Sequence, residues 1–225
     1  MKLKQLEGYL GEVASFKEPK VQLEQYPTTA HLASRMLYTA ETAYGDIGDK
    51  AVVDLGCGCG MLSIAAAMMG ASSVVGIDID TDALAVAQDN LGALEVEDVV
   101  ELMRADLCHR PTDGSSLELS QQLLAGMRAK FDTAVLNPPF GTKPGNKGID
   151  VVFLQAACLM ARDAVYSLHK SSTREHLIKK VQSWGYKCEV LAELKFDVPM
   201  MYKFHKKKAV DVEVDLLRIV LREAL

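Results

Sequence analysis

The chain has 225 residues, of which 49% are hydrophobic and 24% charged, and its formal net charge is −5. This length allows one compact domain with a sizeable core and leaves no room for a second large domain. No stretch approaches the ~20 uninterrupted apolar residues that a membrane-spanning helix needs. The first residues also lack the apolar core and cleavage site of a secretion signal. We therefore expect a soluble protein of the cytoplasm or nucleus with no membrane partner.

Charge is unevenly distributed along the chain. Residues 169–208 hold ten Lys or Arg against four Asp or Glu, a balance of +6, and the remainder holds 15 against 26, or −11. Because local fields guide association, this basic segment keeps a nucleic-acid partner possible despite the acidic total. A solvated helix face followed by a basic loop is the alternative. The five cysteines are irregularly spaced, mostly inside apolar runs, which favours reduced, packed thiols.

The first 45 residues differ in character from the rest. An amphipathic helix is predicted over roughly 2–14 and a second over 29–43, with Thr28 as the N-cap of the second. Between them the segment EQYPT predicts a fixed kink, because a proline biases the residue before it toward an extended conformation. We interpret residues 1–45 as a helical lid on a core formed by 46–225, within a single domain.

From residue 51 onward, short apolar runs alternate with helical patterns. Short apolar runs predict buried strands, and the longer periodic runs between them predict helices. Thr81 is the expected N-cap of one helix, and Ser172 with Glu175 forms an expected capping box for another. The expected elements, in chain order, are strand 51–55, helix 61–69, strand 73–78, helix 81–91, strand 99–106, a loop running into a helix, strand 131–140, helix 148–161, strand 163–169, helix 172–184, strand 186–194 and strand 210–221.

The order of these elements defines a fold class. Alternating strands and helices require a mainly parallel sheet with helices on both faces, because right-handed crossovers place the helices there. The strands at 186–194 and 210–221 follow each other without a helix between them. We expect these two strands to pair antiparallel at one edge of the sheet. The sequence therefore predicts an α/β fold with a seven-stranded, mostly parallel sheet.

The segment DLGCGCG, residues 54–60, leaves the first of these strands and opens a helix. Closely spaced glycines let the backbone approach a ligand without obstruction by Cβ atoms. A dinucleotide fingerprint, G-x-G-x-x-G, would need a glycine where this chain has Met61. Asp54, two residues before Gly56, makes the turn a poor place for a pyrophosphate and a good one for a sulfonium with an α-amino group. We therefore predict that this turn, Gly58 included, binds S-adenosyl-L-methionine.

Two further acids follow later strands. Asp78 closes the second strand, 18 residues beyond Gly60, where a carboxylate can accept both ribose hydroxyls. Asp106 ends the third strand, so both acids should meet the glycine turn at the carboxyl edge of the sheet. Each acid alone could instead cap the next helix or loop. Cys57 and Cys59 have no partner pair at a zinc-like spacing, so no metal is predicted.

Asn137-Pro138-Pro139-Phe140 follows the fourth predicted strand. The prolines offer no N–H and hold φ near one value, and Asn137 is kept extended by the proline after it. The Asn137 side-chain oxygen and the Pro138 carbonyl can each accept a hydrogen from one planar amino group, while Phe140 stacks on the ring that carries it. Such acceptors help to localise the lone pair of a weakly nucleophilic amine. A proline turn that simply ends a strand is the alternative, but its place at the cofactor edge favours a catalytic loop.

Six segments together resemble a known family: DLGCGCG, IDID, NPPFGTK, AVYSLHKSSTREH, EQYPT and YKFHKKKAVDVEVDL. The chain is similar over nearly its whole length to the methyltransferase-like protein five family, the adenine-N6 methyltransferases of small-subunit ribosomal RNA. The resemblance implies a Rossmann-like class I methyltransferase fold, and a target adenine held by Asn137, Pro138 and Phe140. The residues that it implies for contact with S-adenosyl-L-methionine are Gln25, Thr28, Gly56, Cys59, Asp78, Asp106 and Leu107.

The resemblance also implies partners and a location. The family pairs with a small zinc-binding methyltransferase activator subunit, and an exposed strand edge at 99–105 would suit such docking. Lys206, Lys207 and Lys208 follow two aromatic residues, a pattern suited to phosphate contacts in RNA, although a solvated basic turn is the alternative. A place in the cytoplasm and nucleus, including the nucleolus, is expected for such an enzyme.

Three alternatives remain open from the residues alone. An Asn-Pro-Pro-aromatic loop also serves methylation of glutamine N5 in proteins, and a guanine-N2 target has the same amine chemistry. Phe140 in place of Tyr, together with the basic segment, favours RNA. A non-catalytic ribosome-assembly factor is the third alternative, which the intact NPPF segment and acid set disfavour. The role of residues 108–130, the stretch least similar to the family, stays open.

Overall fold

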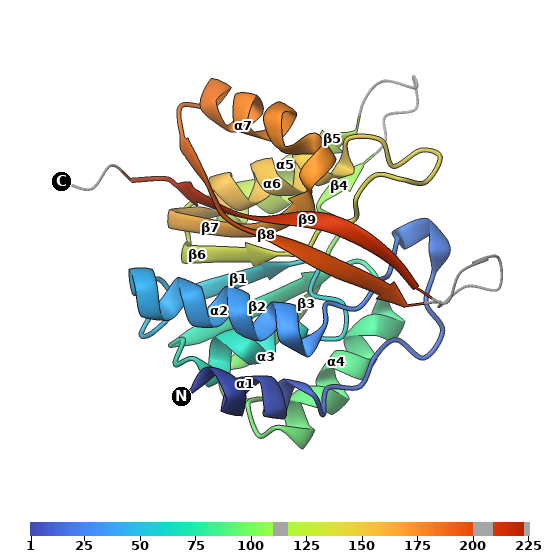
Figure 1. Ribbon diagram of the computed structural model, residues 1–225, viewed down its shortest axis with the longest axis vertical. Coiled ribbons are helices and arrows are strands. Elements are labelled where there is room, and N and C mark those ends of the chain that lie inside the picture. The colour runs from blue at the N-terminus through green and yellow to red at the C-terminus, as the bar shows by residue number, and fades with distance from the viewer. Residues whose placement is uncertain (110–116, 200–208, 223–225) are drawn as a thin grey trace.

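The computed structural model describes residues 1–109, 117–199 and 209–222 and shows one central sheet with helices on both faces (Figure 1). The sheet has seven strands in the order β3-β2-β1-β6-β7-β9-β8, which confirms the predicted fold class. From edge to edge, the strands are β3 (Val100–Arg104), β2 (Ser73–Asp78), β1 (Ala51–Leu55), β6 (Phe131–Leu136), β7 (Ala161–Lys170), β9 (Ala209–Val220) and β8 (Lys187–Pro199).

The strand directions follow the expected pattern. Strands β3, β2, β1, β6 and β7 pair in parallel, and β9 runs antiparallel to both of its neighbours, β7 and β8. The last two strands therefore pair antiparallel at one edge, as predicted. A separate two-stranded ladder, which the sequence patterns did not reveal, joins β4 (Cys108–His109) to β5 (Glu118–Leu119).

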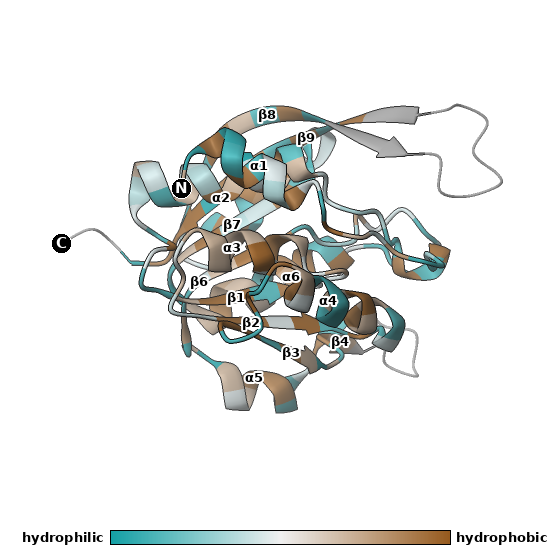
Figure 2. Cartoon of the chain, turned by 90° about the horizontal axis from the view of Figure 1, so that it is seen from below, coloured by the Kyte–Doolittle hydropathy of each residue, from teal (hydrophilic) through white to brown (hydrophobic). Residues whose placement is uncertain are grey.

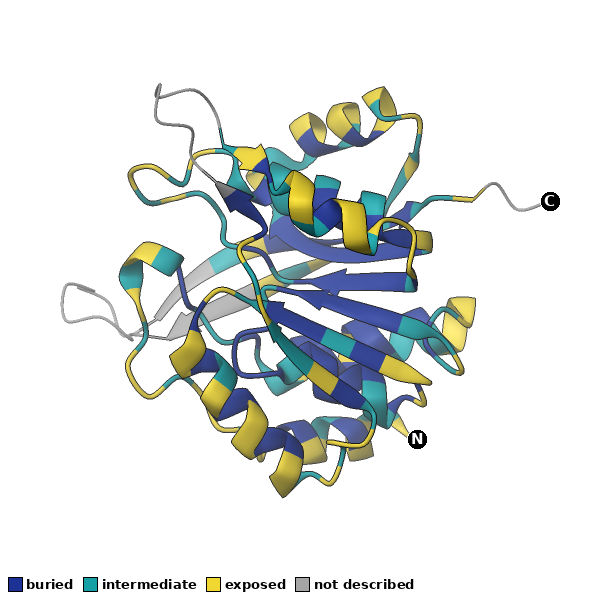
Figure 3. Cartoon of the chain, turned by 180° about the vertical axis from the view of Figure 1, so that it is seen from behind, coloured by how far each residue is buried: buried dark blue, intermediate teal, exposed yellow. Residues whose placement is uncertain are grey.

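The helices divide between the two faces of the sheet. One face packs against α1 (Leu3–Leu10), α2 (Ala30–Tyr44) and α3 (Met61–Met68), and α4 (Thr81–Ala93) adds Leu91 to the same apolar cluster. The other face packs against α5 (Gln121–Met127), α6 (Ile149–Met160) and α7 (Arg174–Ser183). The inner strands are buried and the outer helices expose one side (Figure 3). Helices α3 and α6 are mostly apolar because each lies close against the sheet (Figure 2).

Several predicted element ends are wrong. The first helix ends at Leu10 rather than near residue 14, and β6 ends at Leu136 rather than 140. The strand stops there because the two prolines that follow Asn137 have no N–H for the ladder. Two short 3₁₀ turns, η1 (Val21–Leu23) and η2 (Ser171–Thr173), were not predicted.

The three predicted helix caps are also wrong. Helix α2 is capped by Thr29, whose hydroxyl accepts from the Leu32 N–H, and not by Thr28. Helix α4 is capped by the Asp80 carboxylate rather than by Thr81. The proposed capping box at Ser172 is absent, because a 3₁₀ turn precedes α7 and the side chain of the N-cap residue Thr173 does not cap the helix. A cap one residue away preserves the helix itself, so the sequence pattern could not distinguish the alternatives.

The length of the helices and the state of the cysteines are two further properties of the described chain. None of the helices in the described part of the chain is long and apolar enough to cross a membrane. All five cysteines lie within the described residues and have free thiols. Burial raises the pKa of Cys57 well above its usual value and that of Cys59 to about 12, so both thiols stay neutral at physiological pH.

Candidate functional site

Two adjoining cavities lie at the carboxyl ends of β1, β2 and β6. The larger has an empty volume of about 790 Å³, open mouth included, which suits a ligand the size of a nucleoside. The smaller lies toward the N-terminal lid and reaches Thr28 and Cys59. The two cavities share the wall residues Phe16, Tyr26, Gly56, Gly58 and Asn137. The predicted cofactor turn and the predicted catalytic loop therefore border the same space.

The glycine turn forms one wall of both cavities through its backbone. Gly56 and Gly58 have φ values of 72° and 54°, a conformation that favours glycine. A Cβ atom at Gly58 would lie 2.9 Å from the Phe16 ring, and one at Gly56 would lie 3.1 Å from the Phe153 ring. A side chain at either position would therefore collide with an aromatic ring that lines the larger cavity, so the turn requires glycine for space as well as for conformation.

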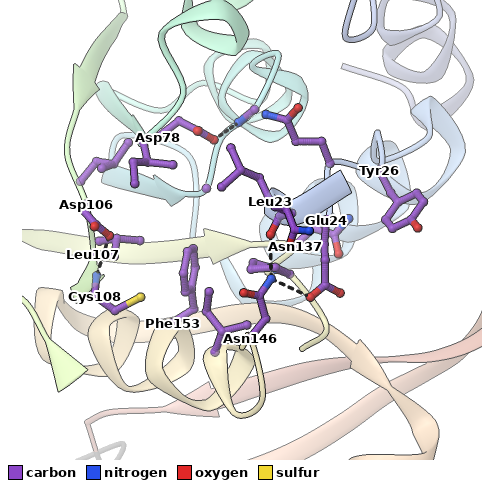
Figure 4. Close-up of a pocket in the computed structure, with 18 of the residues that line it drawn as sticks. Leu23, Glu24, Tyr26, Asp78, Asp106, Leu107, Cys108, Asn137, Asn146 and Phe153 are labelled. Atoms are coloured by element: carbon purple, nitrogen blue, oxygen red, sulfur yellow. Dashed lines mark hydrogen bonds between the residues drawn. The ribbon is translucent and has the colours of Figure 1, made fainter. Parts of the chain in front are cut away.

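Carboxylates from two neighbouring strand ends face the larger cavity (Figure 4). The Asp78 carboxylate accepts from the Gly58 N–H and from the Asp80 N–H, both at 2.9 Å, and burial raises its pKa. The exposed Asp106 accepts from the Cys108 N–H at 3.1 Å, with buried Leu107 between them. Carboxylate oxygens can accept more than one hydrogen bond. Both acids can thus bind hydroxyl or amino groups of a ligand while holding the turns beside them.

Asp54 lies behind the glycine turn and is not part of either cavity wall. Its side chain is only 1% exposed, and Oδ2 accepts from the Ser63 hydroxyl at 2.7 Å. Oδ1 is buried and has no hydrogen-bond partner among the described residues. Burial raises the pKa of Asp54 to about 7, against an opposing effect of the Ser63 hydrogen bond. A cation bound near the turn would stabilise the ionised form.

The raised pKa of Asp54 makes stability depend on pH. Between about pH 4 and pH 7 the folded chain holds a proton on Asp54 that the unfolded chain has lost, so stability falls as pH rises through this window. The slope from this group is at most about 1.4 kcal/mol per pH unit. Asp54→Asn should flatten the fall, which denaturant unfolding of both proteins from pH 5 to 8 would measure. Parallel pH profiles would contradict the raised pKa.

The Asn-Pro-Pro-Phe loop begins where β6 ends. Asn137 and Pro139 border the larger cavity, whereas Pro138 is buried and lines neither cavity. The Asn137 Nδ2 atom donates to the Thr28 hydroxyl oxygen at 2.9 Å. Phe140 is half-buried outside both cavity walls, and the Lys170 ammonium lies 5.6 Å from its ring centroid. Of the four predicted catalytic residues, two therefore border the cavity and two support or flank it.

The N-terminal lid is tied to the cofactor side by polar contacts with α4. Lys20 forms an ion pair with Asp80, and with Asp82 at 2.7 Å, while Gln25 Nε2 donates to Asp80 at 2.6 Å. Gln25 Oε1 accepts from the Lys20 N–H at 2.7 Å. The amide of Gln25, predicted to contact the cofactor, thus positions the lid, although Gln25 also lines the larger cavity.

Glu24 ties the same lid to the catalytic loop, and sequence reasoning missed it. Its buried carboxylate accepts from the Thr142 N–H at 3.0 Å and hydroxyl at 2.7 Å, from the Lys143 N–H at 3.3 Å and from Asn146 Nδ2 at 3.0 Å. Glu24 has φ 52°, a conformation that is uncommon for a residue other than glycine. Asn146 also donates to the Gln22 carbonyl. Figure 4 shows Glu24 and Asn146 meeting opposite Asp78 and Asp106.

Other wall residues could not be predicted because no motif in the sequence connects them. Phe16, Tyr26, Cys108 and Phe153 line the larger cavity from four separate segments. The segment EQYPT was the only signal available for Glu24 and Tyr26, and it indicated a kink rather than contacts. Lys206, Lys207 and Lys208, the predicted RNA-binding residues, lie outside the described residues.

The fold and the site together define a Rossmann-like methyltransferase. The strand order places a glycine turn after β1, acids after β2 and β3, and an Asn-Pro-Pro-Phe loop after β6 around one space. A sequence-family model of ribosomal protein L11 methyltransferase (PrmA) matches residues 26–117, the segment that carries the cofactor turn. The crystal structure of PH1948 from Pyrococcus horikoshii superposes with a TM-score of 0.81 and 32% identity, covering 98% of both chains.

Curated relatives give the particular family. The chain is 51% identical over 218 residues to the rRNA N(6)-adenosine-methyltransferase METTL5 of Danio rerio, covering 97% of this chain and 98% of the relative. It is 45% identical to the rRNA N(6)-adenosine-methyltransferase Mettl5 of Drosophila melanogaster, covering 97% and 96%. The chain therefore belongs to the METTL5 family of rRNA N6-adenosine methyltransferases.

Proposed function

We propose that this protein uses S-adenosyl-L-methionine to methylate the exocyclic N6 amine of an adenosine in small-subunit (18S-type) ribosomal RNA. The relatives support RNA adenine as the substrate class. The observation that carries the proposal is the position of Asn137, which lies in the shared wall of the two cavities. A side chain there can contact a target amine while the neighbouring cavity holds the methyl donor.

The donor cavity fits S-adenosyl-L-methionine on three observations. The glycine turn presents bare backbone to the cavities, because a Cβ atom at Gly56 or Gly58 would collide with an aromatic ring of the wall. Asp78 and Asp106 supply carboxylates at consecutive strand ends, which suit ribose hydroxyls and the adenine amino group. The buried, half-partnered Asp54 carboxylate favours a ligand with positive charge close to the turn. When bound, the donor supplies an electrophilic methyl group on a sulfonium.

The catalytic loop then orients and polarises the acceptor. Asn137 Oδ1 and the Pro138 carbonyl would accept the two hydrogens of the amine, so that positive charge developing on nitrogen during attack is stabilised. Phe140 would stack on the base and restrict its rotation. Holding the nitrogen in line with the methyl group supplies much of the remaining acceleration. The prolines fix this geometry because neither can donate a hydrogen bond or change φ.

Two features support the proposed binding partners, one in the structure and one in the sequence. Strand β3 is the end strand of the sheet and pairs only with β2 among the described strands, so its outer edge suits the small zinc-binding activator subunit. Lys206, Lys207 and Lys208 supply positive charge for ribosomal RNA phosphates. Work on ribosomal RNA would place the protein in the nucleus, including the nucleolus, and in the cytoplasm.

A methyl-transfer assay tests the proposed function directly. Radiolabelled donor is supplied with total RNA and with protein extract in parallel, with and without the activator subunit, and labelled nucleosides are identified by mass spectrometry. We expect N6-methyladenosine in small-subunit ribosomal RNA, formed only with the activator present. Label in protein would indicate a glutamine-N5 enzyme, methylguanosine would indicate a guanine-N2 enzyme, and donor binding without any label would indicate a non-catalytic assembly factor.

A further inference from the structure

An asparagine that must accept a hydrogen bond has an orientation problem. The two ends of its side-chain amide have almost the same shape, but one end accepts and the other donates. With the carbonyl toward a target amine, Asn137 attracts it, and with the –NH₂ toward it, Asn137 repels it. The two orientations therefore differ by one hydrogen bond to the target amine. Some neighbour must therefore hold the amide in the productive orientation.

We propose that Thr28 is the positioning residue that holds Asn137 in its productive orientation, a proposal that rests on the proposed function. Asn137 Nδ2 donates to Thr28 Oγ1 at 2.9 Å, which directs the carbonyl end of the amide away from Thr28. The hydroxyl oxygen is an acceptor in this bond, so its own hydrogen points elsewhere. Thr28 also lines the smaller cavity, where that hydrogen can bond the carboxylate of S-adenosyl-L-methionine. One hydroxyl thus contacts both the methyl donor and Asn137, the residue that binds the target amine.

The surroundings of Thr28 make it a rigid support. Thr28 is only 8% exposed and lies between Pro27 and Thr29. The Thr29 hydroxyl caps α2 by accepting a hydrogen bond from the Leu32 N–H. On the other side of the kink, Glu24 binds the loop that follows Phe140 through four hydrogen bonds. The lid therefore contacts the catalytic loop through two residues, Glu24 and Thr28. Thr28 is the one that bonds the side chain of Asn137.

Two substitutions separate the hydroxyl from the shape of the side chain. Thr28→Val keeps the shape and removes the hydroxyl, whereas Thr28→Ser keeps the hydroxyl. Thr42→Val is a matched control, because among the described residues the hydroxyl of the exposed Thr42 bonds the Tyr38 carbonyl alone. Single-turnover rates at saturating donor, affinity for S-adenosyl-L-homocysteine and melting temperature are measured for each, with adenine-containing ribosomal RNA as substrate.

We expect Thr28→Val to lower the single-turnover rate by about 10- to 100-fold, the loss that a slightly misplaced catalytic group causes. Thr28→Ser should stay within about threefold of the parent, and Thr42→Val should leave the rate unchanged. Equal losses for Val and Ser would overturn the proposal, because then the methyl group and not the hydroxyl matters. A weaker affinity with an unchanged rate at saturation would also overturn it, since Thr28 would then contact the donor alone.

A second measurement tests orientation itself. Asn137→Asp places a carboxylate on the loop, and both of its oxygens accept, so no neighbour is needed to orient it. In that background Thr28→Val should cost less than about threefold in rate, a non-additive result that reports direct coupling of the two residues. A cost as large as in the parent would argue against orientation. If the parent protein labels no adenine at all, the proposed function fails. The affinities for S-adenosyl-L-homocysteine would then still show whether Thr28 contacts the methyl donor.

Discussion

Replacing Asn137 with alanine is expected to reduce methyl transfer by at least about 10³-fold, the upper range for loss of one catalytic hydrogen-bonding group. Donor affinity should change by only a few-fold, because the larger cavity is formed mainly by the glycine turn, the strand ends and the lid. Single-turnover assays and calorimetry with S-adenosyl-L-homocysteine would measure the two quantities separately.

A matched control keeps the Asn137 result interpretable. Gln122→Ala truncates an amide on the exposed surface of α5, which contributes to neither cavity, and it should leave both quantities unchanged. A loss of donor affinity in parallel with activity would mean that Asn137 supports the donor site instead. The bond to Thr28 makes this distinction important, because truncation also leaves the Thr28 hydroxyl without its partner.

The sheet and the location of the site could be predicted from the sequence because each depends on local patterns. A buried parallel strand is a continuous apolar run, as in AVVDL, and such runs place the carboxyl-end residues that follow them at one edge. Asp78, Asp106 and Asn137 each lie at the end of a strand or within two residues of it, and the structure brings all three to one cavity. The positions of these residues at strand ends were therefore enough to predict the location of the site without any knowledge of long-range contacts.

The hydrogen bonds between the EQYPT kink of the lid and the core could not be predicted because they join residues at least 55 positions apart. Glu24 meets Thr142 and Asn146 through a carboxylate that looks like any surface acid in the sequence. Asp54 illustrates a second limit: its position before the glycine turn indicated ligand contact, but side-chain direction placed it behind the turn against Ser63. Patterns along one strand report burial and do not report which polar partner a side chain will find.

Asp78→Ala is the second substitution with a large expected effect, and it should act in the opposite way to Asn137→Ala. Removing a carboxylate that accepts both ribose hydroxyls should weaken donor affinity by about 10- to 100-fold, since a hydrogen bond to a charged group contributes about 1.5–3 kcal/mol. Transfer at saturating donor should persist, because Asp78 does not touch the acceptor loop. Titration with S-adenosyl-L-homocysteine, followed by rates at high donor concentration, would measure both.

Asp78 has a structural role that the experiment must separate from donor binding. Its carboxylate also holds the Gly58 and Asp80 N–H groups, so the variant could lose affinity because the glycine turn shifts. Asp78→Asn keeps an acceptor for one of these groups, and Asp98→Asn removes the same charge from an exposed site outside both cavities. If ribose contact dominates, Asp78→Asn should bind the nucleoside 2′-deoxyadenosine and adenosine equally weakly, whereas the parent should prefer adenosine. Unchanged donor affinity in Asp78→Ala would exclude Asp78 from ribose binding, because the loss of a charged hydrogen-bond acceptor for the ribose must weaken binding.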